Sequence, residues 1–192
     1  SIYKNDIYLK IGKYFYQRKK YTDAVVWLQK TDRTEVASTQ LTEYYFKLGY
    51  AHFQLGEYTA ARNAFYEIKD DSSNYAAPAL YYYSHIAYQN ETYQEALDGF
   101  LKLLNHPTFK NEVPYYITQI YYLLGDYEKL TDFAPDLMSR GEEPRSPEMN
   151  LLIGDAYYRT KKYDEAADYL KAYDRSSETT REQDYALAFA YY

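Results

Sequence analysis

The chain has 192 residues, of which 46% are hydrophobic and 26% charged, so it carries enough apolar material for a folded core and is not a disordered segment. Its 28 acidic side chains outnumber its 22 basic ones, and no broad basic run reverses this balance, which disfavours nucleic acid as a partner. The absence of cysteine excludes disulfides, zinc–cysteine sites and thiol nucleophiles. No apolar stretch is long enough to insert this segment into a membrane, and the compartment stays open between cytoplasmic and exported, because a cleaved signal peptide leaves no trace.

Helical patterns follow one another along the whole chain. We predict eleven helices, at approximately residues 5–18, 21–33, 40–55, 58–69, 77–90, 93–105, 112–124, 127–139, 147–160, 163–174 and 181–192. Short polar turns join each odd-numbered helix to the next, and longer polar links separate the resulting pairs. Pro135 falls inside the eighth helix, where it removes a backbone hydrogen bond, so we expect a kink or an early end there.

An internal repeat organises these helices. Five tyrosines recur at intervals of 34 to 37 residues: Tyr21, Tyr58, Tyr93, Tyr127 and Tyr163. Other residue types keep the same step. Three residues after each tyrosine come Ala24, Ala61, Ala96, Leu130 and Ala166, seven after come Leu28, Phe65, Phe100, Ala134 and Leu170, and nine before come Gly12, Gly49, Ser84, Thr118 and Gly154. These offsets place a small and a large residue on one helix face, which predicts two closely packed helices in each unit.

The segment from Leu48-Gly49 through Gly56-Glu57-Tyr58, Ala61 and Phe65 resembles the tetratricopeptide repeat. The resemblance implies an all-α fold, a right-handed superhelical solenoid of antiparallel helix pairs, covering residues 1–192 as a single domain. The expected repeats are residues 5–38, 42–75, 77–110, 111–146 and 147–180, with a partial repeat at 181–192. Ser84 and Thr118 depart from the family's glycine. Because the chain stops after the first helix of a sixth unit, we expect it to be a fragment of a longer protein.

The resemblance also implies that the first helix of each pair lines a concave groove that holds ligands. Three rows of side chains at i, i+4 and i+7 share that face, and aromatic residues dominate two of them. The candidate partner-binding residues are Lys13, Tyr16, Phe46, Tyr50, Phe53, Tyr81, His85, Tyr88, Tyr115, Gln119, Tyr122, Asp155 and Tyr158. An alternative is that the aromatic rows only stack neighbouring units together.

No catalytic, cofactor or metal site emerges from the sequence. The three histidines have no metal-ligand spacing to carboxylates, and there is no glycine-rich phosphate loop, so we do not expect an enzyme and expect no cofactor. The family's clamp for a C-terminal carboxylate is also not expected, because only Lys13 fits it while Tyr50 and His85 occupy the next positions.

The function favoured by these observations is a protein-interaction scaffold that binds a peptide or protein segment in an aromatic groove. The alternative is an architectural spacer or self-association module within a larger protein, whose groove is filled in cis or by a second copy. The sequence does not identify the partner.

Overall fold

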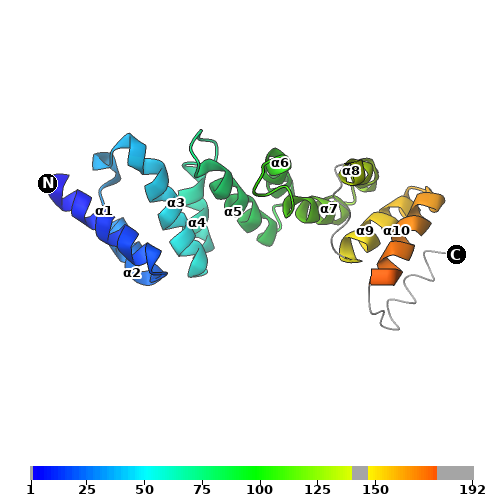
Figure 1. Ribbon diagram of the computed structural model, residues 1–192, viewed down its shortest axis with the longest axis horizontal. Coiled ribbons are helices and arrows are strands. Elements are labelled where there is room, and N and C mark those ends of the chain that lie inside the picture. Colours follow the sequence, from blue (N-terminus) through cyan, green and yellow to red (C-terminus); the bar gives the residue numbers. More distant parts are fainter. Residues whose placement is uncertain (1, 140–146, 177–192) are drawn as a thin grey trace. The chain divides into compact units, whose positions relative to one another are not determined.

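A computed structural model describes residues 2–139 and 147–176, and this part of the chain is helical with no strand. Its elements are α1 (Ile2–Gln17), α2 (Tyr21–Gln29), η1 (Arg33–Glu35), α3 (Ser38–Gln54), α4 (Tyr58–Tyr66), α5 (Ala76–Gln89), α6 (Tyr93–Leu103), α7 (Val113–Leu123), α8 (Tyr127–Ser139), α9 (Pro147–Arg159) and α10 (Tyr163–Ser176). Figure 1 shows the helices following one another as hairpin-connected pairs. The chain forms two compact units, residues 1–99 and 100–192.

The first ten predicted helices correspond to α1 to α10, and the eleventh, at residues 181–192, lies outside the described residues. The prediction for the second helix was wrong at its end, because α2 stops at Gln29 and not at residue 33. Asn5 of α1 explains this early end. Its side-chain amide donates to the Asp32 carbonyl at 3.0 Å and its carbonyl accepts from the Asp32 amide, so both backbone groups of Asp32 are satisfied outside a helix.

The eighth helix has its predicted range, because α8 continues through Pro135 to Ser139; of the expected kink or early end, the early end does not occur. Pro135 has no N–H to donate to the carbonyl four residues earlier, that of Thr131. The hydroxyl of Tyr157, on α9, donates to this carbonyl at 3.0 Å. A tyrosine from the next helix pair therefore replaces the hydrogen bond that the proline removes.

The five turns within the helix pairs have the same backbone conformation. The residue two positions before each repeat tyrosine has a positive φ: Lys19 57°, Gly56 75°, Glu91 59°, Gly125 71° and Lys161 62°. The following amide then donates to the carbonyl five residues earlier, as from Lys20 to Phe15 at 3.0 Å and from Glu57 to His52 at 2.9 Å. This pattern is the Schellman helix ending, which satisfies carbonyls that a helix end leaves free.

The repeated small and large residues form the core of each helix pair. Ala24, Ala61 and Ala96 have no exposed surface, and neither do Leu28 and Phe65. A side chain in place of Gly12 or Gly49 would collide with Leu28 or Phe65 on the paired helix, which explains the glycines of this row. The expected close packing of the two helices in each pair is therefore confirmed.

Ser84 stands where these units have glycine, and a second substitution makes room for it. Its facing residue on α6 is Gly99, where an added Cβ would come within 1.9 Å of the Ser84 hydroxyl oxygen. The glycine has moved from the first helix of this pair to the second. In the fourth repeat the exchange has another form, because Thr118 replaces glycine while the large residue of the second helix becomes Ala134, and both are buried. Volume is conserved across each crossing.

No helix in the described residues combines the length and apolar character that a membrane span requires.

Candidate functional site

All thirteen predicted groove residues are half-buried. In the N-terminal unit they lie on α1, α3 and α5, which are the first helices of their pairs, and in the C-terminal unit they lie on α7 and α9. Side chains of this intermediate exposure are accessible to a ligand on one side and packed on the other. The groove assignment itself remains a prediction.

The last of the three rows packs against the repeat tyrosines. In each of the five helix pairs, the aromatic ring five residues before the repeat tyrosine lies at an angle to the tyrosine ring. The ring centroids are 5.5 to 6.2 Å apart: Tyr16–Tyr21, Phe53–Tyr58, Tyr88–Tyr93, Tyr122–Tyr127 and Tyr158–Tyr163. These edge contacts are the favourable geometry for aromatic pairs. The row thus stabilises each pair's turn, whether or not it also contacts a ligand.

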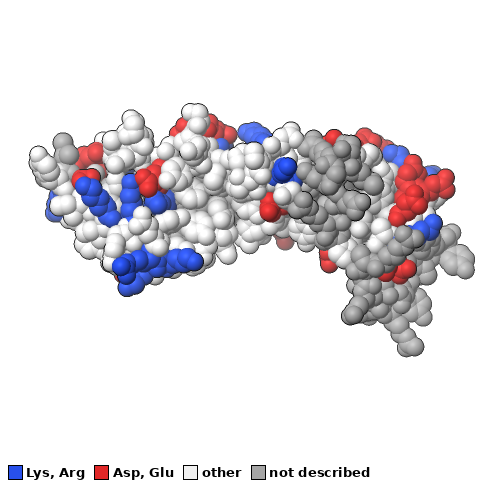
Figure 2. Space-filling view, in the orientation of Figure 1, with Lys and Arg blue, Asp and Glu red and all other residues white. Residues whose placement is uncertain are grey.

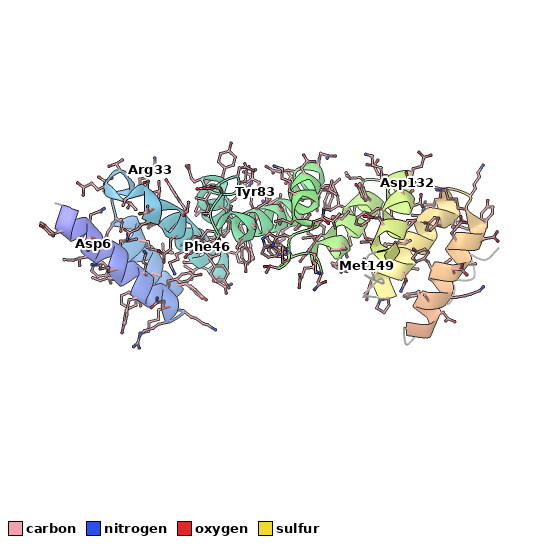
Figure 3. All side chains as sticks on the ribbon, turned by 45° about the horizontal axis from the view of Figure 1, so that its top comes forward. Asp6, Arg33, Phe46, Tyr83, Asp132 and Met149 are labelled. Atoms are coloured by element: carbon pink, nitrogen blue, oxygen red, sulfur yellow. The ribbon has the colours of Figure 1, made fainter. Side chains whose placement is uncertain are left out.

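The N-terminal unit joins these rings into one surface, which we call the aromatic cluster and define as Tyr16, Tyr21, Phe46, Tyr50, Phe53 and Tyr82. Tyr50 is at its centre, with its ring centroid 5.9 Å from Tyr16, 6.0 Å from Tyr21 and 5.2 Å from Tyr82. Tyr82 continues to Phe53 at 5.0 Å. Phe46, labelled in Figure 3, stacks on Tyr50. Rings from α1, α2, α3 and α5 therefore form a continuous patch.

Tyr82 and Lys47 also contact this surface but were not among the predicted groove residues. Both belong to a fourth row, one residue after the first: Lys10, Lys47, Tyr82, Tyr116 and Leu152. The repeat register contained this row, which precedes the middle predicted row by three residues and therefore lies beside it on each helix. Only the packing of α1, α3 and α5 shows that two of its members contact the predicted residues, since Lys47 lies 4.4 Å from the centre of the Tyr16 ring.

A charged group sits beside the aromatic cluster. The ammonium of Lys13 donates to the carboxylate of Glu43 at 2.6 Å, and that of Lys47 lies 3.4 Å from the same carboxylate. Partial burial alone would raise the pKa of Glu43, but the hydrogen bond from Lys13 and the charges of both lysines outweigh it and lower that pKa. Glu43 therefore remains a carboxylate at neutral pH.

His85 extends the surface on α5. Its ring stacks almost parallel to Tyr81, with centroids 6.3 Å apart, and lies 5.9 Å from Phe53. Burial lowers the pKa of His85, so the imidazole is neutral at pH 7 and presents an aromatic face.

The C-terminal unit pairs its polar groove residues with one another. The hydroxyl of Tyr122 on α7 donates to Asp155 of α9 at 2.7 Å, and the guanidinium of Arg159 bonds the same carboxylate oxygen. Burial and this hydrogen bond raise the pKa of Tyr122 to about 12. Asp155, predicted as a recognition residue, thus links two helices of its own chain.

In the described residues no group of three or more His, Cys, Asp or Glu side chains is placed to hold a metal ion.

The repeat geometry agrees with a known family. The tetratricopeptide repeat model matches residues 47–108 and 137–179, which is more than half of the chain. The chain belongs to the tetratricopeptide repeat family. Repeats of this family serve as protein-interaction scaffolds and are generally non-catalytic, and their stacked units present extended binding surfaces.

Solved tetratricopeptide repeat structures have the same fold. A structure of MamA AMB-1 gives a TM-score of 0.73 at 15% identity, covering 96% of this chain and 98% of that one. Another MamA structure gives 0.68 at 21% identity, covering 91% of this chain and 92% of that one. PilF of Pseudomonas aeruginosa gives 0.59 at 16% identity, covering 97% and 86%. No curated protein matches the sequence. At these identities the likeness concerns the fold alone, and it confirms the predicted all-α class of antiparallel helix pairs.

Proposed function

We propose that this tetratricopeptide repeat protein binds a peptide or protein segment on the groove faces of its first helices. The observation that carries the proposal is the aromatic cluster of the N-terminal unit. There, six large rings from neighbouring helix pairs meet in one surface, and each ring is partly buried and partly exposed. Rigid rings with polar tips provide contact area at low conformational cost, as in antibody paratopes.

The matched test compares groove tyrosines with a tyrosine elsewhere on the same scaffold. Tyr88→Ala and Tyr122→Ala remove groove rings, while Tyr66→Ala removes a ring of the second helix α4 that is 62% exposed. Immobilised wild type and each variant are used to capture proteins from an extract, and the captured proteins are quantified by mass spectrometry. We expect at least one captured protein to bind the wild type and Tyr66→Ala equally well and to bind a groove variant with about thirtyfold lower affinity. This loss corresponds to about 2 kcal/mol of binding free energy for an interface anchor.

Thermal unfolding controls for loss of structure. Because Tyr88 and Tyr122 also pack on Tyr93 and Tyr127, each variant is expected to lose about 0.5–1.5 kcal/mol of stability. Ala96→Leu, which overpacks a fully buried site, should destabilise by about 1–3 kcal/mol and still bind while folded. Equal loss of binding in Ala96→Leu and Tyr88→Ala, or no effect of either groove variant on any partner, would contradict the proposal. Self-association of the wild type that Tyr88→Ala abolishes would favour the self-association alternative.

A further inference from the structure

The groove face of α1, α3 and α5 carries more positive than negative charge. Lys13 and Lys47 share the single carboxylate of Glu43, and their side chains are only 19% and 11% exposed. The other acid on α1, Asp6, is paired with Lys10 at 2.7 Å, and α5 contains no aspartate or glutamate. Figure 2 shows Lys and Arg side chains gathered over the α1–α3 end of this unit. Among the described residues of these three helices, one half-buried positive charge is therefore left without a matching carboxylate.

Tyrosine rings adjoin this charge. Lys47 lies over the Tyr16 ring, and Tyr16, Tyr50 and Tyr82 are ring neighbours, with a hydrogen bond joining Tyr50 and Tyr82. Burial, followed by the neighbouring Tyr50, raises the pKa of Tyr16 and brings that of Tyr82 to about 12. The phenols of Tyr16 and Tyr82 are therefore protonated at neutral pH and can donate hydrogen bonds. Two ammonium groups thus share one carboxylate beside these rings.

We infer that this part of the groove selects a partner segment in which an aspartate or glutamate side chain stands beside an apolar or aromatic one. The inference rests on the proposed function and adds the chemistry of the ligand. The partner's carboxylate binds Lys13 and Lys47, where charge-assisted hydrogen bonds in a partly desolvated site are strong, and its apolar neighbour covers Phe46 and Phe53. A peptide fits better than a nucleic acid, because the chain's net charge of −6 repels a phosphate backbone.

The test starts from a library of random dodecapeptides displayed without a free C-terminus, selected on the purified chain. Peptides that bind wild type and Tyr66→Ala but not Tyr50→Ala are taken as groove-dependent. We expect them to be enriched in aspartate and glutamate next to aromatic or aliphatic residues. Selection on a Lys13→Glu, Lys47→Glu double variant should instead enrich lysine and arginine.

A variant of Glu43 provides the control, because its expected effect on binding is opposite to that of the lysine variants. A purely structural role of these three residues would not predict opposite effects. With a synthetic consensus peptide, Lys47→Met and Lys13→Met should each weaken binding about tenfold. Glu43→Gln should strengthen it, because Glu43 competes with the partner's carboxylate for the same lysines. Circular dichroism confirms that each variant is folded, and the two methionine variants provide independent tests if one of them unfolds.

The outcomes separate the two proposals. Groove-dependent peptides without acidic enrichment, or weakening by Glu43→Gln as large as by Lys47→Met, would overturn this inference and leave the proposed function standing. The absence of any peptide that depends on Tyr50 would overturn both. If a fluorescent oligonucleotide binds with the same dependence on Lys13 and Lys47, the inferred ligand would be a nucleic acid and not an acidic peptide.

Discussion

At the scale of single residues, the turn within each helix pair requires a left-handed backbone at one position. Gly56 and Gly125 occupy it in two units, but Lys19, Glu91 and Lys161 occupy it in the others. A residue with a Cβ is strained in this conformation by roughly 1 kcal/mol, whereas glycine is not. Three turns of the chain therefore contain avoidable strain.

Replacing Lys19, Glu91 or Lys161 by glycine should raise stability by about 0.5–1 kcal/mol each, because the turn then adopts its conformation without strain. All three side chains are exposed, so little packing is lost. Chemical denaturation measures the effect, and Gly56→Ala is the reverse control, expected to destabilise. Glycine variants that are less stable than wild type would show that the side chains contribute more than the strain costs.

Gly99 is expected to behave against the usual helix rule. Gly→Ala in a helix interior normally stabilises by about 0.5–1 kcal/mol, but here the new Cβ meets the buried Ser84 side chain, so Gly99→Ala should destabilise by about 1–3 kcal/mol. In a Ser84→Gly background the obstacle is gone, and the same substitution should become stabilising. Thermal unfolding of the four proteins checks this. An unchanged sign in the Ser84→Gly background would contradict the exchange of glycine between the two helices.

At the scale of helices, contacts between neighbouring pairs correct local defects. The Tyr157 hydroxyl satisfies the Thr131 carbonyl that Pro135 leaves free, and Thr131 is buried, so water does not replace this bond easily. An unsatisfied buried carbonyl costs about 1–3 kcal/mol. The helix α8 tolerates its proline because α9 supplies the missing donor.

Tyr157→Phe should therefore destabilise the wild type by about 1–3 kcal/mol. In a Pro135→Ala background the alanine amide can donate to Thr131, and the cost of Tyr157→Phe should fall markedly. A double-mutant cycle by chemical denaturation gives the coupling. Equal costs in both backgrounds would mean that the tyrosine hydroxyl does not substitute for the missing backbone bond.

An ion pair joins three helices of the N-terminal unit. Arg62 of α4 donates to Glu95 of α6 at 2.8 and 2.9 Å, and also to the hydroxyl of Tyr83 on α5 at 2.9 Å. Partial burial alone would raise the pKa of Glu95, but hydrogen bonds from Tyr83 and Arg62 outweigh it and lower that pKa below its ordinary 4.5. The unfolded chain thus binds a proton at this site at a higher pH than the folded chain does.

The stability due to Glu95 should accordingly be fully present above pH 4.5 and be lost as the pH falls through the lower, folded pKa. Since the side chain is 36% exposed, Glu95→Gln should cost only about 0.2–1 kcal/mol at pH 7. The difference from wild type should shrink in acid, and Arg62→Met should remove the same pH dependence. Denaturation at a series of pH values checks this, and a difference that grows as the pH falls would have the wrong sign.

At the scale of the whole molecule, the aromatic rows have two roles at once. The alternatives considered from the sequence were recognition and packing, but each ring of the last row packs on its repeat tyrosine and is still half-exposed. Tyrosine suits both, because its ring packs while its hydroxyl remains available. A loss of stability in a groove variant is therefore compatible with a role in binding, and only the comparison with Ala96→Leu separates them.

The sequence by itself determined the helices, the repeat and the buried rows. Residues such as Ala61, Phe65 and Gly49 recur at helical spacing, and both periodicity and burial are local properties that repetition makes visible. The predicted groove rows came from the same register. Local pattern was sufficient wherever a residue's environment is formed by its own helix pair.

Only the tertiary structure decided which residues from different pairs meet. The pairing of Lys13 and Lys47 with Glu43, the position of Tyr82 beside Tyr50, and the bond from Tyr157 to Thr131 all join residues that the repeat register treats independently. The early end of α2 and the passage of α8 through Pro135 have the same kind of cause, since Asn5 and Tyr157 act from other helices. Hydrogen bonds and charge pairs depend on distances between helices, and a periodic sequence does not contain those distances.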